Sequence, residues 1–141
     1  MSQFHYREAR SILCGDLIGE GSARKVYQCL MNADYVVKIE TGGKSFQNAA
    51  EWETWSWVRA TAMEKWFAPC HLISPCGLLL VQRKVAPLRD SELPPKLPAF
   101  LCDFKKENFG LLEKRIVCCD YGTVFSAIRT ASKRLLKAGW R

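Results

Sequence analysis

The residue types best suited to metal and phosphate chemistry stand in two short segments of the second half of the sequence. Residues 103–108 read Asp-Phe-Lys-Lys-Glu-Asn, and residues 120–122 read Asp-Tyr-Gly after an apolar run. Carboxylate and amide oxygens are hard ligands of the kind that Mg²⁺ prefers. Asp103, Asn108 and Asp120 therefore form a candidate magnesium set, although each segment alone could be a surface loop.

A lone lysine in the first half of the sequence is a second candidate. Lys38 stands within the apolar segment 35–39, and burying a lysine without a partner is costly. It therefore needs a carboxylate or a phosphate, unless its side chain reaches from a sheet edge into solvent. Glu51 and Glu53 follow on a predicted helix, and the spacing does not decide between them.

A glycine-containing turn precedes this lysine. Gly19 and Gly21 stand between two predicted strands, and Val26 follows them. Glycines let the backbone approach phosphates and point its N–H groups at them, while a β-branched residue can cover a base. Two glycines in a hairpin are more often simply a turn. This segment therefore indicates phosphate binding only together with the other features.

The segments that must position these residues form an α+β pattern. An antiparallel meander comes first, and a helix that has Ser45 as its N-cap and reaches about Lys65 follows it. After the helix come two more strands, a proline-rich link, a hairpin and a terminal helix over residues 123–138. The predicted strands are 15–20, 24–31, 35–39, 70–74 and 78–81, and the predicted hairpin pairs 109–112 with 115–119.

Composition limits the class of protein. The 141 residues are 48% hydrophobic and 25% charged, which excludes a disordered or collagen-like chain, and no apolar run is long enough to cross a membrane. Seven cysteines and a start without a signal-peptide pattern favour a cytoplasmic protein with reduced thiols. Five of the seven net positive charges lie after Thr123, either as a surface for an anionic partner or as a solvated helix face.

Taken in order, these segments resemble a protein kinase of the Ser/Thr type reduced to a minimum. Residues 103–108 resemble the catalytic loop D-L-K-P-E-N, Asp120-Tyr-Gly122 resembles D-F-G, Val36-Val-Lys38 resembles the end of V-A-I-K, and Gly19 and Gly21 with Val26 resemble the phosphate-covering loop. The resemblance covers about residues 15–122.

The resemblance implies a fold and a division of the chain. The fold would be α+β and protein-kinase-like, with a five-stranded antiparallel sheet and one long helix in a first lobe, residues 1–86. A proline-rich link, 87–100, would lead to a reduced second lobe, 101–141, with a catalytic-loop hairpin and a terminal helix. The whole would be a single kinase-like domain.

The resemblance also implies how the nucleotide would be held. ATP and Mg²⁺ would be the cofactors, and Lys38 would hold the α- and β-phosphates, clamped by an acidic residue of the first helix for which we prefer Glu51 to Glu53. Residues 82–86 would form the hinge against which adenine packs. The remaining nucleotide-binding positions are Gly19, Gly21, Val26 and Val36.

The catalytic roles follow from the same resemblance. Asp103 would orient or deprotonate the attacking hydroxyl group, and Lys105 would steady the γ-phosphoryl group as its charge shifts. Asn108 and Asp120 would bind magnesium. The implied reaction is phosphoryl transfer from ATP to Ser or Thr of a protein substrate.

The sequence also departs from the family. Arg24 replaces the third glycine of the phosphate-covering loop, Leu101-Cys102 replaces the His-Arg before the catalytic Asp, and the substrate-binding helical lobe is nearly all missing. Two hypotheses follow. One is an active miniature phosphotransferase, which the retained motif residues favour. The other is a pseudokinase-type module that inhibits or scaffolds a partner protein without catalysis, which the missing lobe favours.

A nucleic-acid binder is a third hypothesis, because the end of the chain is basic and aromatic residues could stack on bases. Helical spacing puts these aromatics on several faces, so we expect them in a core or a protein contact, and we expect neither a nucleic acid nor a membrane as partner. The aromatics are Trp52, Trp55, Trp57, Trp66 and Phe67.

Such compact kinase-like chains resemble bacterial or phage accessory proteins. The expected location is the cytoplasm, which would be that of the host if the chain is phage-encoded.

Overall fold

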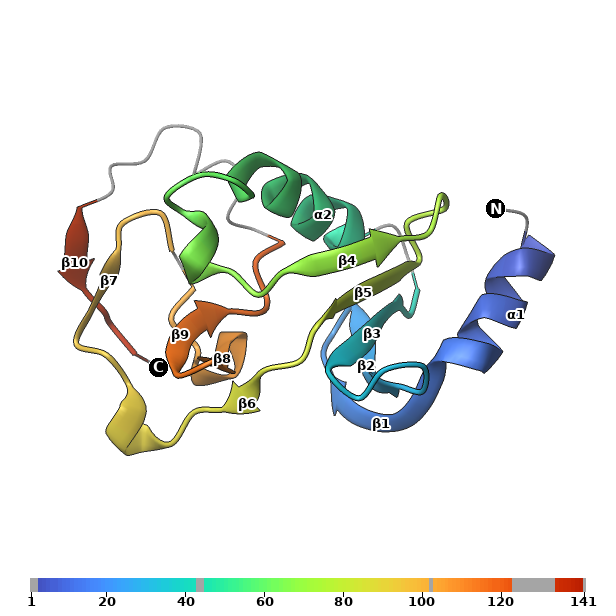
Figure 1. Ribbon diagram of the computed structural model, residues 1–141, viewed down its shortest axis with the longest axis horizontal. Coiled ribbons are helices and arrows are strands. Elements are labelled where there is room, and N and C mark those ends of the chain that lie inside the picture. The colour runs from blue at the N-terminus through green and yellow to red at the C-terminus, as the bar shows by residue number, and fades with distance from the viewer. Residues whose placement is uncertain (1–2, 43–44, 102, 123–133, 141) are drawn as a thin grey trace. The chain divides into compact units, whose positions relative to one another are not determined.

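The computed structural model (Figure 1) describes residues 3–42, 45–101, 103–122 and 134–140. The chain divides into two compact units, each with β-structure of its own. The first unit comprises Met1–Trp52 and Pro69–Lys84, and the second comprises Glu53–Ala68 and Val85–Arg141.

The first unit is built on a five-stranded antiparallel sheet, which confirms the sheet expected from the strand pattern. Its strands lie in the order β1-β2-β3-β5-β4. Because β3 lies in the middle, four consecutive residues from Val36 to Ile39 are buried, and Lys38 is one of them. The strands are β1 (Cys14–Glu20), β2 (Arg24–Cys29), β3 (Tyr35–Glu40), β4 (Cys70–Ile73) and β5 (Leu79–Arg83).

Helix α1 (Gln3–Leu13) packs its apolar side chains into the core of this unit, and we did not expect it from the sequence. Tyr6, Ala9 and Leu13 lie three and four residues apart, which is the spacing of one helix face. This spacing was the available signal. Tyr6 belongs to a core cluster with Cys29, Val37, Ile39, Leu79 and Val81, and Ala9 and Leu13 pack against it.

Helix α2 (Gln47–Val58) is the predicted long helix, but it ends earlier than expected. Ala60 takes a left-handed conformation, with a φ of 63°, which is a common way for a helix to stop. Only a short 3-10 turn, η1 (Glu64–Trp66), follows it. The expectation of one helix reaching about Lys65 was therefore wrong.

The start of α2 is capped by a side chain from β3. The backbone N–H of Asn48 donates to Glu40 Oε1 at 2.7 Å, and the Ser45 hydroxyl donates to the other oxygen of the same carboxylate. A carboxylate at a helix N-terminus satisfies an unpaired N–H and interacts well with the helix dipole. The capping role that we expected of Ser45 thus belongs to Glu40.

The second unit contains the predicted hairpin. Strands β8 (Phe109–Leu112) and β9 (Arg115–Cys118) pair in antiparallel fashion, and β6 (Ala86–Pro87) lies on the other side of β8. The turn residues Glu113 and Lys114 both have left-handed φ values, of 51° and 67°. Two such residues between paired strands make the tight turn whose twist suits a hairpin.

The proline-rich link contains a short strand that pairs with the end of the chain. Between Pro87 and Pro98 the backbone is mostly extended, with a 3-10 turn, η2 (Asp90–Glu92), and a strand, β7 (Lys96–Pro98). Strand β10 (Leu135–Lys137) runs antiparallel to β7. The prediction of a terminal helix over 123–138 is therefore wrong at its end, because the backbone hydrogen-bonding groups of this segment pair with β7 instead. Residues 123–133 lie outside the described part of the chain.

Gly110 offers a test of the packing in this unit. A Cβ at this position would lie 2.4 Å from Val85 Cγ2 and 2.8 Å from the Ala86 carbonyl oxygen. We expect Gly110→Ala to lower the free energy of unfolding by about 1–3 kcal/mol, because backbone has to shift. Urea denaturation measures this. Gly139→Ala is the matched control, since an added Cβ there meets nothing within 4 Å, and equal losses in the two variants would contradict the expectation.

Within the described residues, neither helix combines the length and the apolar character needed to span a membrane.

Candidate functional site

Lys38 is buried in the first unit and pairs with Glu51. Its ammonium group donates to Glu51 Oε1 at 3.0 Å and to Oε2 at 3.3 Å, and the two side chains are 6% and 0% exposed. Glu53, the other carboxylate that the spacing left open, is exposed. The structure thus brings Lys38 and Glu51 together and excludes a lysine that reaches from the sheet into solvent.

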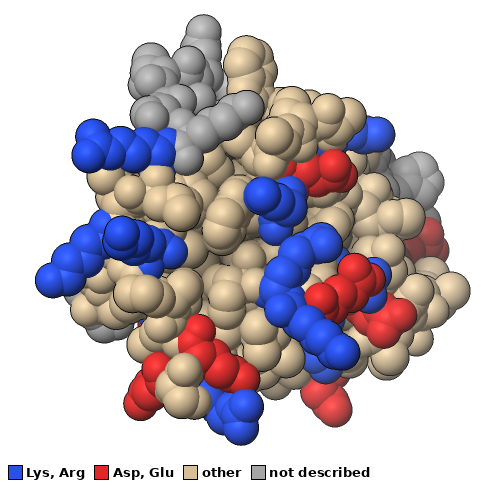
Figure 2. All heavy atoms as spheres, turned by 60° about the vertical axis from the view of Figure 1, so that its left-hand side comes forward, with Lys and Arg blue, Asp and Glu red and all other residues tan. Residues whose placement is uncertain are grey.

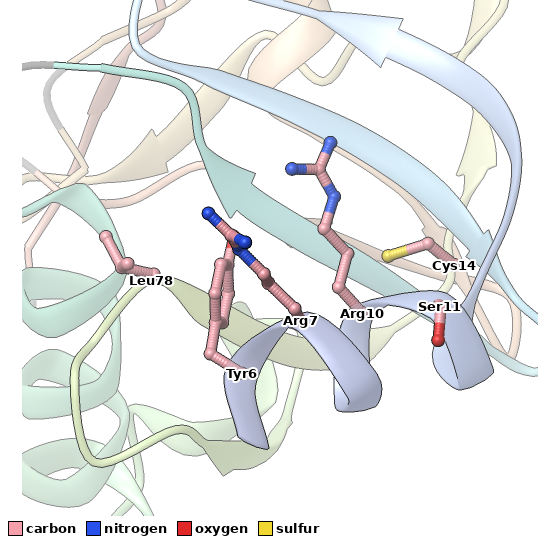
Figure 3. Close-up of a pocket in the computed structure, with 6 residues that line it drawn as sticks. All are labelled: Tyr6, Arg7, Arg10, Ser11, Cys14 and Leu78. Atoms are coloured by element: carbon pink, nitrogen blue, oxygen red, sulfur yellow. The ribbon is translucent and has the colours of Figure 1, made fainter. Parts of the chain in front are cut away.

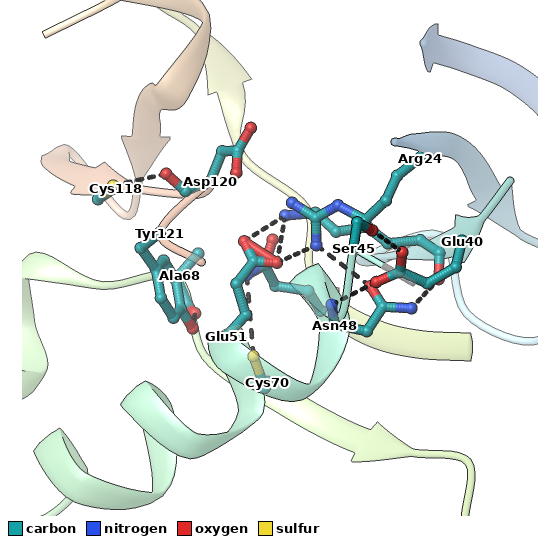
Figure 4. Close-up of polar contacts among 12 residues, drawn as sticks. Arg24, Glu40, Ser45, Asn48, Glu51, Ala68, Cys70, Cys118, Asp120 and Tyr121 are labelled. Atoms are coloured by element: carbon teal, nitrogen blue, oxygen red, sulfur yellow. Dashed lines mark hydrogen bonds and ion pairs between the residues drawn. The ribbon is translucent and has the colours of Figure 1, made fainter. Parts of the chain in front are cut away.

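Arg24 is a second buried cation on the same carboxylate (Figure 4). Its Nη1 donates to Glu51 Oε2 and to Asn48 Oδ1, the latter at 3.1 Å. Asn48 in turn donates from Nδ2 to the carbonyl oxygen of Lys38 at 3.1 Å. We did not expect this contact from the sequence, because Glu51 lies 27 residues beyond Arg24 and no local pattern spans that distance.

The glycine-containing turn joins β1 to β2. The N–H of Gly21 donates to the Arg24 carbonyl oxygen at 2.8 Å, and Gly19 lies opposite Val26 across the strand pair. Neither glycine has a left-handed φ, and an added Cβ would meet nothing nearer than 3.7 Å at Gly19 or 3.9 Å at Gly21. The fold itself therefore does not require glycine at these two positions.

Val26 and Val36 lie beside Lys38 in the sheet. Val26 pairs with Lys38 across β2 and β3, while Val36 lies two residues before Lys38 and so points to the same face. Val36 is paired with Gln82, the first residue of the predicted hinge. Gln82 is 1% exposed, its Nε2 donates to Cys70 Sγ at 3.8 Å, and its Oε1 has no hydrogen-bond partner among the described residues.

In the second unit, Asn108 joins the two predicted catalytic segments. Its Nδ2 donates to the carbonyl oxygen of Asp103 at 3.2 Å, and its own carbonyl oxygen accepts from the N–H groups of Cys119 at 2.8 Å and Asp120 at 3.3 Å. Asn108 is buried, Asp103 half-buried and Asp120 exposed. Segment 103–108 therefore lies directly beside the residues that precede Gly122.

Tyr121 anchors the segment that carries Asp120. Its ring is fully buried and packs edge-on against Phe67, with ring centres 4.9 Å apart. Its hydroxyl group donates to the carbonyl oxygen of Ala68 at 2.8 Å (Figure 4). The buried tyrosine thus fixes the backbone on one side of Asp120 while Asn108 holds the other.

The loop 103–108 is also held at its surface. Lys106 donates to Asp90 Oδ1 at 2.8 Å, and this contact lowers the pKa of the exposed Asp90 carboxyl and raises the pKa of Lys106. The ring of Phe104 stacks on Phe109 and meets Trp140 edge-on, with ring centres 6.4 and 5.9 Å apart. The last described residues of the chain therefore pack against this loop.

The predicted site residues thus form two groups, one in each unit. The first group lies on neighbouring strands, in the turn between β1 and β2 and at the start of α2, and its members are Gly19, Gly21, Val26, Val36, Lys38 and Glu51. In the second, Asp103, Asn108 and Asp120 are linked through Asn108, and Lys105 is an exposed residue of the same loop. The part of the chain that the structure describes holds no group of three or more His, Cys, Asp or Glu side chains that could bind a metal on its own.

Two surface hollows lie in the first unit, and neither is lined by a predicted site residue. The larger, about 520 Å³, lies beside α1 (Figure 3). Arg10 donates from Nη2 to the Tyr27 hydroxyl at 3.3 Å there, and burial raises the pKa of the Cys14 thiol. The lining residues are Tyr6, Arg7, Arg10, Ser11, Cys14 and Leu78.

The described surface bears on the nucleic-acid hypothesis. Figure 2 shows a face on which acidic side chains lie among basic ones. Arg134 and Lys137 are the described members of the basic terminal segment, and both are exposed. Among the aromatic residues, Trp55 and Phe67 are buried, as core residues are.

No protein-family model matches the chain, and no curated protein matches it. Among solved structures, the chain is similar to one described as the streptomycin–ATP–APH(2″)-IIa ternary complex, with a TM-score of 0.46 and 14% sequence identity. The match covers 63% of this chain and 30% of the other, so this chain spans less than a third of that protein's length.

Proposed function

We propose that this chain is a kinase-like phosphotransferase that uses ATP and Mg²⁺ to phosphorylate a hydroxyl group, with Ser or Thr of a protein as the acceptor. The observation that carries the proposal is the buried ion pair of Lys38 and Glu51. A lysine fixed by a carboxylate in this way is one of the recurring parts of phosphoryl-transfer sites. It stands between the glycine turn and the hinge segment that the sequence motifs single out.

The first unit would bind the nucleotide. Lys38 would contact the α- and β-phosphates, and Glu51 would keep its ammonium group in place. The bare backbone at Gly19 and Gly21 supports a phosphate-covering role, because glycine is not needed there for packing or for backbone geometry. Val26 and Val36 would cover the adenine.

The second unit would carry the transfer step. Asp103 would accept a hydrogen bond from the acceptor hydroxyl group and take its proton as the new phosphate ester bond forms and the bond to the ADP oxygen breaks. Lys105 would balance charge on the γ-phosphoryl oxygens. Asn108 supports this assignment, since it holds the backbone of Asp103 and of Asp120 at the same time.

Mg²⁺ fits the donor atoms of the second unit. Donation from Asn108 Nδ2 to the Asp103 carbonyl leaves Oδ1 as the oxygen that would bind the metal, and Asp120 follows on the hydrogen-bonded neighbouring segment. Two protein oxygens with phosphate oxygens and water is the usual Mg²⁺ environment. Bound there, the ion would neutralise charge on the phosphate oxygens.

A binding module without catalysis is the second candidate, and exposed apolar residues in the first unit favour it. Strand β1 lies at the edge of its sheet and exposes Leu17 and Ile18, and Leu30 and Met31 are exposed just after β2. Exposed apolar side chains at a sheet edge are typical of protein contacts. This candidate predicts partner binding that is independent of Asp103.

Transfer of label from γ-labelled ATP tests the proposal. Wild type incubated with a host-cell lysate should label proteins, and Asp103→Ala should reduce the labelling rate by about 100-fold or more, as loss of a general base does. Asp34→Asn, an exposed aspartate in a turn, is the matched control and should label as wild type does. Equal labelling by wild type and Asp103→Ala would contradict the catalytic proposal.

A parallel binding measurement separates catalysis from nucleotide affinity. Mg-ATP at about a hundred times its Kd should stabilise the wild type by about 2.7 kcal/mol. This gain should disappear in Lys38→Met. A gain without label transfer would leave the non-catalytic module, and absence of both would refute nucleotide use altogether.

A further inference from the structure

We infer that Arg24 is a positioning residue for Lys38, acting through their shared partner Glu51. The inference rests on the proposed function, in which Lys38 contacts the phosphates of ATP. Arg24 stands where the resemblance to kinases leads one to expect a third glycine. Its side chain does not extend over the glycine turn but is directed to Glu51 and Asn48.

The first step of the inference rests on the burial of the three side chains and on the way in which Lys38 and Arg24 share the two carboxylate oxygens of Glu51. Lys38 donates to Glu51 Oε1 at 3.0 Å and to Oε2 at 3.3 Å, while Arg24 donates to Oε2, and the side chains of all three residues are less than a tenth exposed. A carboxylate held at both oxygens cannot rotate about its last bond without breaking a buried charged hydrogen bond. The direction in which Glu51 offers its oxygens to Lys38 therefore depends on Arg24.

Asn48 carries the second step. Its amide oxygen accepts from Arg24 at 3.1 Å and its amide nitrogen donates to the Lys38 carbonyl oxygen at 3.1 Å. Arg24 thus reaches the side chain of Lys38 through Glu51 and its backbone through Asn48. Both bonds come from the same guanidinium nitrogen, Nη1, whose two N–H groups are held at a fixed angle in the guanidinium plane, whereas the donors of a lysine ammonium rotate about its terminal bond.

The backbone of Arg24 carries the third step. Its carbonyl oxygen accepts the N–H of Gly21 at 2.8 Å, which closes the turn between β1 and β2. One residue therefore connects the glycine turn, by its backbone, with the Lys38 and Glu51 pair, by its side chain. In the proposed function, this connection fixes the phosphate-contacting lysine before any nucleotide is bound.

ATP affinity measured in full-length variants tests the inference. We expect Arg24→Met to raise the Kd for ATP by about tenfold or more, the cost of losing a charged hydrogen bond, and Arg24→Lys to lie between it and wild type. Lys25→Met, the next residue along β2 and half-exposed, is the control and should bind as wild type does. Wild-type affinity in Arg24→Met or in Arg24→Lys would overturn the inference.

A double substitution distinguishes positioning from general destabilisation. If Arg24 acts through Lys38, adding Arg24→Met to Lys38→Met should weaken ATP binding no further, because the lysine to be positioned is already absent. A loss that adds to that of Lys38→Met would show that Arg24 only stabilises the fold. If Arg24→Met does not fold, the same comparison is made with Arg24→Lys.

A measurement without nucleotide separates this inference from the proposed function. Reductive methylation of the Lys38 amine, followed by peptide mass spectrometry, should be about tenfold or more faster in Arg24→Met than in wild type, because a loosened Glu51 no longer holds the amine. Lys25→Met should leave the rate unchanged. Faster methylation in a protein that does not bind ATP would refute nucleotide use and retain the positioning role, while an unchanged rate would refute the role.

Discussion

Replacing Glu51 by glutamine is expected to lower the free energy of unfolding by about 3–5 kcal/mol, the largest change of stability that we expect from one substitution in this chain. The carboxylate is fully buried and binds both Lys38 and Arg24. Without its negative charge, Lys38 and Arg24 both lose the buried carboxylate that they share. An uncompensated buried charge costs far more than the ion pair itself contributes to stability.

Urea denaturation at neutral pH measures this loss, and Glu53→Gln is the matched control. Glu53 lies two residues further along the same helix and is exposed, so its replacement should change the free energy of unfolding by about 0.5 kcal/mol or less. The Glu51→Gln protein should also lose the stabilisation by Mg-ATP. A Glu51→Gln protein as stable as Glu53→Gln would show that the buried charges are neutralised by other means.

The sheet of the first unit could be predicted from the sequence because its strands are short apolar runs separated by turn residues. Segment 35–39 is the clearest example, since aromatic and β-branched residues surround its one lysine, and it forms β3 at the centre of the sheet. The hairpin of β8 and β9 was equally readable. Only two residues, Glu113 and Lys114, separate its two apolar segments, and such a short separation predicts a hairpin.

The secondary structure near the two ends of the chain was not predicted from the sequence in the same way. Helix α1 carries only a narrow apolar face, and its packing on Val37 and Leu79 decides that it forms. Residues 135–137 have helical spacing with the residues before them, yet they pair with β7. At the second of these ends, the contact with a distant segment overrides the local pattern, whereas the spacing of Tyr6, Ala9 and Leu13 was a local signal for α1.

The candidate site likewise contains residues that the sequence pointed to and residues whose contacts only the structure shows. The order and spacing of motifs singled out Lys38 and the segments around Asp103 and Asp120 as candidates, because their residue types resemble the recurring parts of a phosphoryl-transfer site. The choice between Glu51 and Glu53 depended on the helix phase relative to the sheet, which only the structure shows. Arg24 was recognised as a departure from the kinase pattern that the sequence resembles, but its partner could not be inferred.

Trp140 is expected to support the loop 103–108 from the last described segment of the chain. Its ring meets Phe104 and Phe109 edge-on, with ring centres 5.9 and 5.1 Å apart, and its Nε1 donates to the Pro94 carbonyl oxygen at 2.8 Å. Backbone bonds between the last described segment and the proline-rich link, such as Ala138 N–H to the Pro95 carbonyl at 2.9 Å, hold the tryptophan in place.

Trp140→Ala should therefore lower the free energy of unfolding by about 3 kcal/mol, the low end for an aromatic residue because the ring is only half-buried. Under the proposed function, it should also slow label transfer from ATP by about tenfold or more, since a misplaced Asp103 would lose its alignment with the acceptor. Trp57→Ala, on α2 and 51% exposed, is the control for removing a tryptophan. If Trp140→Ala lost stability but transferred label at the wild-type rate, the end of the chain would support the fold of the second unit without positioning its loop.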